Sequence, residues 1–158
     1  MKLKELIPPE RILLDINAAS VEEVIAMLVD HLAKTEHWLK TAAVKQAVLE
    51  RERQVGTGIG NGVAIPHAEP GPYPEPLVAL GRLVRPVDFH APDGKKAQLV
   101  FLLLTPEDLP ALHVRLLARI CRLTRARELR NMLLDAASAI EVSCIIDAHE
   151  KEYPELNP

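Results

Sequence analysis

The feature that most constrains the fold of this chain is an uninterrupted apolar run, Leu-Val-Phe-Leu-Leu-Leu, at residues 99–104. The run is far shorter than the roughly 20 residues that a membrane-spanning helix needs. It is typical of a β-strand covered on both faces, because a strand with one face in water alternates apolar and polar side chains. The run therefore predicts a strand over 97–104 in a sheet that has helices on both sides.

The segments around this strand alternate between strand and helix patterns. Apolar stretches predict strands at 11–16, 63–65 and 77–84. Helices are expected after the capping boxes that begin at Ser20 and Ser138, and from Thr41 and Pro110 onward. This order predicts an α/β three-layer sandwich, with a mixed, mostly parallel sheet of about five strands and helices on both faces. We expect one domain over residues 1–158.

Composition excludes several classes of protein. The 19 basic and 22 acidic residues give a net charge of −3, and aromatic residues make up 3% of the chain, so we expect no nucleic-acid binding. The two cysteines, Cys121 and Cys144, lie among apolar neighbours and are expected to be buried thiols in a reducing compartment. The N-terminus carries no apolar stretch typical of a secretory signal. The sequence thus predicts a cytoplasmic protein without membrane insertion.

Four of the seven glycines lie in one window, Gly-Thr-Gly-Ile-Gly-Asn-Gly at 56–62. Glycine permits positive φ and removes side chains that would block the approach of a ligand. The short strand at 63–65, then Pro66 and His67, follow the window, and a proline-rich loop extends over 70–76. His67 is therefore expected at the end of a strand, beside a glycine-rich turn, which is a position suited to chemistry.

Common explanations of a glycine cluster fit poorly. No lysine follows the glycines as a P-loop requires, and the GxGxxG spacing of dinucleotide-binding folds fails at Asn61 and Val63. A purely structural turn remains an alternative. The six histidines show no metal-ligand spacing, so we predict no metal and no organic cofactor. His113 begins the helix after the buried strand and could face the same crevice as His67, although an ordinary helix-terminal histidine is the other interpretation.

The segment from Arg51-Glu52 through the glycines to Ile65-Pro66-His67 closely resembles the active-site motif of a known family. This family is the enzyme IIA domain of the fructose/mannitol class of the phosphoenolpyruvate:sugar phosphotransferase system. The amino-acid sequence of the glycine window is most similar to its nitrogen-regulatory branch. The helix around His113 and the capping box at Ser138 also match the family, so the resemblance covers nearly the whole chain.

The resemblance implies that His67 accepts a phosphoryl group from a phosphohistidine of the phosphocarrier HPr or its nitrogen-branch paralogue. It implies that His113 lines the same site, and that Arg51, Thr57 and the backbone at Gly58 bind the phosphoryl oxygens. Arg51 as an exposed helix residue and Thr57 as a turn cap are the simpler alternatives. Neutral imidazole is a competent nucleophile, and phosphoryl transfer mainly requires positioning and donors to the equatorial oxygens.

One departure from the family affects partners. The loop after His67 contains Glu69 and Glu75 but no lysine or arginine, and an inward-pointing Glu69 would repel a phosphoryl group. The chain is too short to hold a IIB domain or a membrane permease, so it would act on a separate enzyme IIB or on regulatory targets. The alternative hypothesis is a non-catalytic regulatory binding module of the same fold, like cytoplasmic domains attached to some anion transporters.

Overall fold

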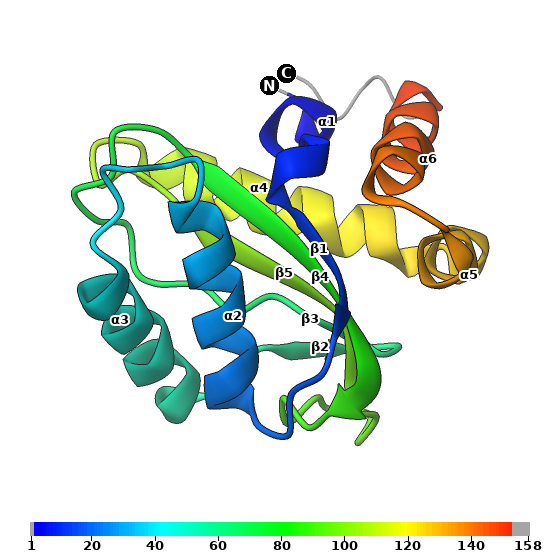
Figure 1. Ribbon diagram of the computed structural model, residues 1–158, viewed down its shortest axis with the longest axis horizontal. Coiled ribbons are helices and arrows are strands. Elements are labelled where there is room, and N and C mark those ends of the chain that lie inside the picture. The colour runs from blue at the N-terminus through cyan, green and yellow to red at the C-terminus, as the bar shows by residue number, and fades with distance from the viewer. Residues whose placement is uncertain (1, 153–158) are drawn as a thin grey trace.

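The computed structural model describes residues 2–152, which form a five-stranded sheet in the order β1-β4-β5-β3-β2 (Figure 1). The strands are β1 (Ile12–Ile16), β2 (Gly58–Gly60), β3 (Val63–Ala64), β4 (Leu77–Val87) and β5 (Ala97–Leu104). The helices are α1 (Leu3–Leu6), the 3-10 turn η1 (Pro9–Arg11), α2 (Val21–Ala33), α3 (Thr41–Gln54), α4 (Pro110–Arg125), α5 (Arg127–Asp135) and α6 (Ala139–Lys151).

The sheet is mixed, as the sequence predicted. β1 is parallel to β4 and β3 is parallel to β5, whereas the pairs β4–β5 and β2–β3 are antiparallel. Isolated bridges continue the parallel pairing beyond β3, where His67 pairs with Leu103 and Gly71 pairs with Pro106. The carboxyl ends of β3 and β5 therefore lie at the same edge of the sheet.

Two hydrophobic cores, one on each face of the sheet, complete the sandwich. Figure 1 shows α2 and α3 on one face and α4 behind the other, with α5 and α6 beside it. Along β5, Val100 and Leu102 belong to the core under α2 and α3, whereas Phe101 and Leu103 belong to the core under α4. The apolar run is thus buried on both faces, which confirms the prediction from its composition.

The helix starts follow local capping chemistry. The hydroxyls of Ser20 and Ser138 accept the backbone N–H groups three residues later, each at 3.2 Å. The carboxylates of Glu23 and Glu141 accept N–H groups of Ala19 and Ala137 just before each helix. The serine bonds confirm Ser20 and Ser138 as N-caps, whereas each glutamate accepts from the residue before the N-cap and not, as a capping box requires, from the N-cap itself.

Some elements escaped the sequence analysis. The short helices α1 and α5 and the strand β2 were not predicted, because they are short and β2 consists largely of glycine. The prediction of two buried cysteines is wrong for Cys144, which is exposed on α6, while Cys121 is partly buried. No helix among residues 2–152 is long and apolar enough to cross a membrane.

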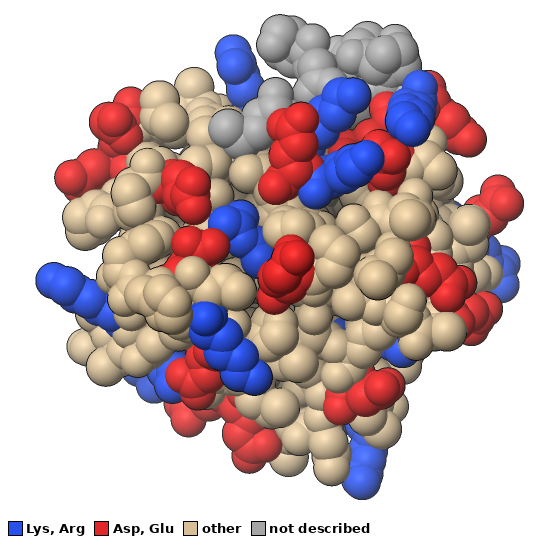
Figure 2. All heavy atoms as spheres, turned by 45° about the horizontal axis from the view of Figure 1, so that its top comes forward, with Lys and Arg blue, Asp and Glu red and all other residues tan. Residues whose placement is uncertain are grey.

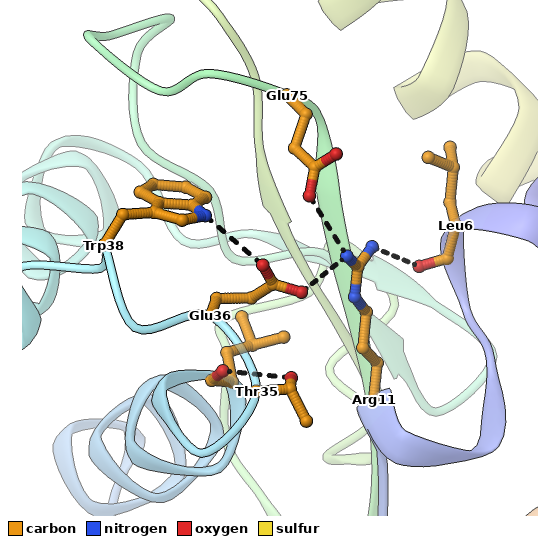
Figure 3. Close-up of polar contacts among 7 residues, drawn as sticks. Leu6, Arg11, Thr35, Glu36, Trp38 and Glu75 are labelled. Carbon is orange, nitrogen blue, oxygen red and sulfur yellow. Dashed lines mark hydrogen bonds and ion pairs between the residues drawn. The ribbon is translucent and has the colours of Figure 1, made fainter.

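A buried arginine fixes the loops near the start of β4 (Figure 3). The guanidinium of Arg11 donates to the carbonyl of Leu6 at 3.1 Å and pairs with the carboxylates of Glu36 at 2.8 Å and Glu75 at 3.5 Å. The other oxygen of Glu36 accepts the indole N–H of Trp38 at 3.2 Å. This cluster connects η1, the segment after α2 and the end of the proline-rich loop, so the loop that follows His67 is anchored.

Candidate active site

His67 lies where β3 ends against β5. Its bridge to Leu103, together with the bond from the Leu103 N–H to the Pro66 carbonyl at 3.0 Å, fixes the backbone on both sides of the histidine. The side chain is largely buried, with 8% of its surface exposed. The structure therefore places His67 at the strand end that the sequence predicted.

The backbone also fixes which nitrogen of His67 carries the proton. Nδ1 lies 2.8 Å from the carbonyl oxygen of Ile65, and a carbonyl can only accept, so Nδ1 is the protonated nitrogen. Nε2 then carries the lone pair. Burial lowers the pKa of His67 below its ordinary value of 6.5, the Ile65 carbonyl partly opposes this shift, and the charge of Arg51 adds to it. The neutral, nucleophilic form is thereby favoured near neutral pH.

His113 lies in the first turn of α4 and faces His67. The two ring centroids are 5.2 Å apart, with the ring planes at 63°. This geometry brings together the two histidines that the sequence singled out and excludes the interpretation of His113 as an ordinary helix-terminal residue. Burial lowers the pKa of His113, and the neighbouring His67 lowers it further, so both rings favour the neutral form.

A threonine at the end of β5 orients His113. The hydroxyl of Thr105 lies 2.6 Å from Nδ1 of His113, and the Thr105 side chain is completely buried. Among the described residues, the Thr105 hydroxyl has no hydrogen-bond partner other than Nδ1 of His113. If the hydroxyl accepted a hydrogen bond from Nδ1, its own proton would be buried without a partner, which costs free energy. The hydroxyl therefore donates to Nδ1, and Nε2 of His113 carries the proton.

Arg51 reaches both histidines from the last turn of α3. Its charge contributes to the lowered pKa of His67 and of His113. Its guanidinium donates to the carbonyl of Val55 at 3.0 Å, and Nε lies 4.0 Å from a carboxylate oxygen of Glu69. Glu69 is 78% exposed, so it lies at the rim and does not fill the site. The structure thus places the predicted arginine beside the histidine pair.

Thr57 and Gly58 donate to groups of the protein itself. The backbone N–H and the hydroxyl of Thr57 both donate to the buried carboxylate of Glu52, at 2.9 and 2.6 Å. The N–H of Gly58 donates to the carbonyl of Phe89 at 3.0 Å. Both residues therefore shape the loop beside His67, and their binding of phosphoryl oxygens stays a prediction.

The glycines are needed for close packing. A Cβ at Gly56 would lie 2.5 Å from the carbonyl oxygen of Phe89, and a Cβ at Gly58 would lie 2.8 Å from the Cβ of Ala91. Gly60 and Gly62 have φ values of 95° and 78°, which favour glycine in the turn between β2 and β3. Gly56 and Gly58 therefore hold the loop tightly against residues 89–91.

The structure adds two residues that the sequence analysis missed. Glu52 holds Thr57, whose carbonyl accepts the N–H of Ile65 at 3.1 Å, and the Ile65 carbonyl in turn holds His67. Thr105 has the corresponding position behind His113. Glu52 belonged to the motif that resembles the family's active site, but the sequence analysis gave it no role, and Thr105 carried no sequence signal. No group of three or more histidine, cysteine or acidic residues within 2–152 is arranged to hold a metal ion.

Comparison with known proteins agrees with this site. Residues 5–149 match the family model described as "Phosphoenolpyruvate-dependent sugar phosphotransferase system, EIIA 2". The chain is 38% identical over 151 residues to the fructose-specific EIIABC component of Bacillus subtilis, covering 96% of this chain and 24% of that longer protein. It is 34% identical over 150 residues to the nitrogen regulatory protein of Bradyrhizobium diazoefficiens, covering 92% of this chain and 95% of the relative.

A solved structure matches as well. The nitrogen regulatory protein IIA-Ntr of Neisseria meningitidis superposes with a TM-score of 0.83 at 32% identity, over 91% of this chain and 98% of that one. The family model, the sequence relatives and the solved structure all point to the same family. The chain therefore belongs to the EIIA 2 family of the phosphoenolpyruvate-dependent sugar phosphotransferase system and is an enzyme IIA component that is similar to nitrogen regulatory proteins.

Proposed function

We propose that this protein carries a phosphoryl group on Nε2 of His67. The observation that carries the proposal is the bond from Nδ1 of His67 to the Ile65 carbonyl, since it leaves the Nε2 lone pair free beside a second histidine and an arginine. The lone pair attacks the phosphorus of a phosphohistidine on a carrier protein. One N–P bond forms and one breaks, the leaving nitrogen keeps the electron pair, and no net proton transfer between the two rings is required.

The donors to the transferred group come from Arg51 and His113. A guanidinium offers several N–H groups to phosphoryl oxygens, and the protonated Nε2 of His113 offers one more. Both groups stabilise the charge on the equatorial oxygens during transfer, which is where positioning and electrostatics contribute most. His67 is therefore the nucleophile and His113 a donor, and these roles follow from their different hydrogen-bond partners.

The partners follow from the family. We propose HPr or its nitrogen-branch paralogue as phosphoryl donor, and either regulatory target proteins or a separate enzyme IIB as recipient. A phosphate monoester carries a charge of about −1.5 to −2 at pH 7, and a phosphoryl group of similar charge at this surface can control the binding of a partner. We place this exchange in the cytoplasm, without direct nucleic-acid contact and without membrane insertion.

The test is intact-mass spectrometry after incubation with phosphoenolpyruvate, enzyme I and the phosphocarrier of the same organism. The wild type should gain one acid-labile phosphoryl group, and His67→Ala should gain none. The variant His90→Ala, at an exposed histidine outside the site, is the matched control and should behave as wild type. Absence of any gain in the wild type would overturn the proposal and favour a non-catalytic binding module of the same fold.

A further inference from the structure

Basic charge is concentrated in one short part of the chain. Residues 115–130 contain six of the 19 basic residues, all of them arginine, and one of the 22 acidic residues, so this segment carries a net charge of +5. The rest of the chain carries −8. The overall charge of −3 therefore conceals a strongly basic region that covers most of α4 and the first half of α5.

The arginines of α4 lie on the side of the helix that faces away from the core. Arg115, Arg119 and Arg122 recur at the i, i+4 and i+7 positions, whereas the buried stripe is formed by His113, Leu116, Ile120 and Leu123. Arg115 and Arg122 are exposed, and Arg119 is partly buried. At 1.5 Å per residue the row extends about 10 Å along the helix. The row starts two residues after His113 but on the opposite side of α4, so one helix diameter separates it from the histidine pair.

A polar pocket adjoins the far end of the row, where α4 meets α5. It has a volume of about 250 Å³ and is lined by four basic residues and no acidic residue. The basic residues are Lys95, Lys96, Arg127 and Arg130. Nη1 of Arg130 donates to the carbonyls of Thr124 and Arg125 at 2.9 and 2.8 Å, so this guanidinium is held in place at the end of α4.

We refer to Arg115, Arg122, Arg125 and Arg127, together with the pocket residues Lys95, Lys96 and Arg130, as the arginine face. Several basic side chains elsewhere pair with acidic ones, as in Lys4–Asp147 and Lys45–Asp30, and Figure 2 shows acidic and basic side chains interspersed over one face. Within residues 2–152, no side chain of the arginine face forms an ion pair. Its charge is thus available to a partner of opposite sign.

The neighbouring residues favour a protein partner over a nucleic acid. Residues 105–135 contain no Phe, Tyr or Trp that could stack on a base. Two exposed apolar side chains lie at the start of α4, with Leu109 45% and Val114 65% exposed. We propose that the arginine face binds an acidic segment of a partner protein, with carboxylates on the arginines and apolar side chains against these two residues.

The position of the face implies that phosphorylation controls this contact, a step that rests on the function proposed above. His113 in the first turn of α4 lies 5.2 Å from His67, centroid to centroid, so a phosphoryl group on His67 adds negative charge beside that turn. That charge lies about one helix diameter from the row, which is comparable with the screening length at physiological salt, so it repels an acidic segment bound to the row. The unphosphorylated protein is therefore the form that binds the partner tightly.

The test measures binding of a fluorescein-labelled acidic amphipathic peptide by fluorescence anisotropy. The peptide consists of Glu, Leu and Ala and has about 20 residues, enough to form a helix. The triple variant Arg115→Gln/Arg122→Gln/Arg125→Gln should bind about tenfold more weakly than wild type. The control Lys34→Gln/Lys40→Gln/Arg85→Gln removes the same charge at exposed positions outside the face and should bind as wild type does.

The outcomes separate this proposal from the phosphoryl-carrier function, because the binding arm uses unphosphorylated protein. Equal loss of binding in both triple variants would overturn the proposed face. Tighter binding of a duplex DNA of similar charge would overturn the choice of a protein partner. In a second arm, protein phosphorylated at His67 should bind the peptide several-fold more weakly than unphosphorylated protein, and unchanged binding would overturn the proposed control. Failure to phosphorylate contradicts the carrier function alone.

Discussion

The two halves of the active site are held by different kinds of contact. On the His67 side, a relay of mostly backbone groups leads from Glu52 through Thr57 and Ile65 to the ring. On the His113 side, the described contact that orients the ring is one hydroxyl, that of Thr105. The first arrangement presents a lone pair and the second an N–H donor, so the same side chain performs two roles in one crevice. The comparison teaches that the hydrogen-bond partner of a histidine determines its role in this site.

The largest effect on the rate of phosphorylation is expected from loss of Arg51, because its charge acts on both halves of the site. Arg51→Gln removes the guanidinium beside the two histidines, and we expect phosphorylation to slow about a hundredfold, as for loss of one donor to transition-state charge. A time course of intact mass measures the rate. Arg53→Gln is the matched control, because Arg53 is exposed and pairs with Glu22 at 3.3 Å. Equal rates in the two variants would show that Arg51 has no role in transfer.

The stability of the protein should depend more on Glu52, which holds the His67 half, than on Thr105, which holds the His113 half. Glu52→Ala removes the acceptor of two hydrogen bonds and leaves buried donors of Thr57 without partners. We expect the free energy of unfolding to fall by about 3 kcal/mol, because each bond to a charged acceptor contributes about 1.5–3 kcal/mol. Chemical denaturation measures this change. Glu50→Ala, at an exposed glutamate of the same helix, should change stability little, and an equal loss in both variants would contradict the relay.

The His113 half should lose orientation with a smaller loss of stability. Thr105→Val keeps the side-chain shape but removes the donor to Nδ1, which permits both tautomers of His113. We expect a transfer rate two- to tenfold lower, corresponding to about 0.5–1.5 kcal/mol for one hydrogen bond. Thr105→Ser keeps the hydroxyl and should restore most of the rate. Nitrogen-15 NMR of the His113 ring reads the tautomer directly, and an unchanged tautomer in Thr105→Val would contradict the assignment.

The smallest effect is a pH dependence of the free energy of unfolding, to which both histidines contribute. The pKa values of His67 and His113 lie below the ordinary value of 6.5, so the unfolded chain binds protons that the folded protein does not as the pH falls below 6.5. The free energy of unfolding therefore decreases with falling pH and levels off below the folded-state pKa values. The double variant His67→Gln/His113→Gln should flatten this slope in denaturation measured from pH 7 to 5, leaving the contribution of His31, whose pKa burial also lowers.

A control for loss of a histidine in general is His37→Gln, at an exposed position after α2. This variant should keep the wild-type slope. If the double variant kept it as well, neither half of the site would hold its histidine in the neutral form by burial.

The difference between local sequence patterns and tertiary contacts explains which parts of the site could be predicted from the sequence. His67 follows a short strand and a glycine window, and these local patterns predicted its place at the strand end. The pairing with His113 required β3 and β5 to be parallel, which followed from the expected sheet. Glu52 resembled one more charged residue of an exposed helix, and its burial depends on how tightly Gly56 and Gly58 pack against residues 89–91.

Thr105 and the arginine face were missed for other reasons. The bond from Thr105 to His113 depends on how the start of α4 is placed against the end of β5, which no local pattern encodes. The arginines of α4 were present in the sequence, but the average over the whole chain concealed them. A charge count taken over each predicted helix would have found them.

The most direct test of the account is the ring nitrogen that receives the phosphoryl group. Nitrogen-15 NMR of the labelled protein, phosphorylated through enzyme I and the phosphocarrier, identifies the nitrogen that is bonded to phosphorus. The hydrogen bond between Nδ1 of His67 and the Ile65 carbonyl predicts phosphorylation at Nε2 of His67, with Nδ1 still protonated. Phosphorus bonded to Nδ1 of His67, or to either nitrogen of His113, would contradict the account.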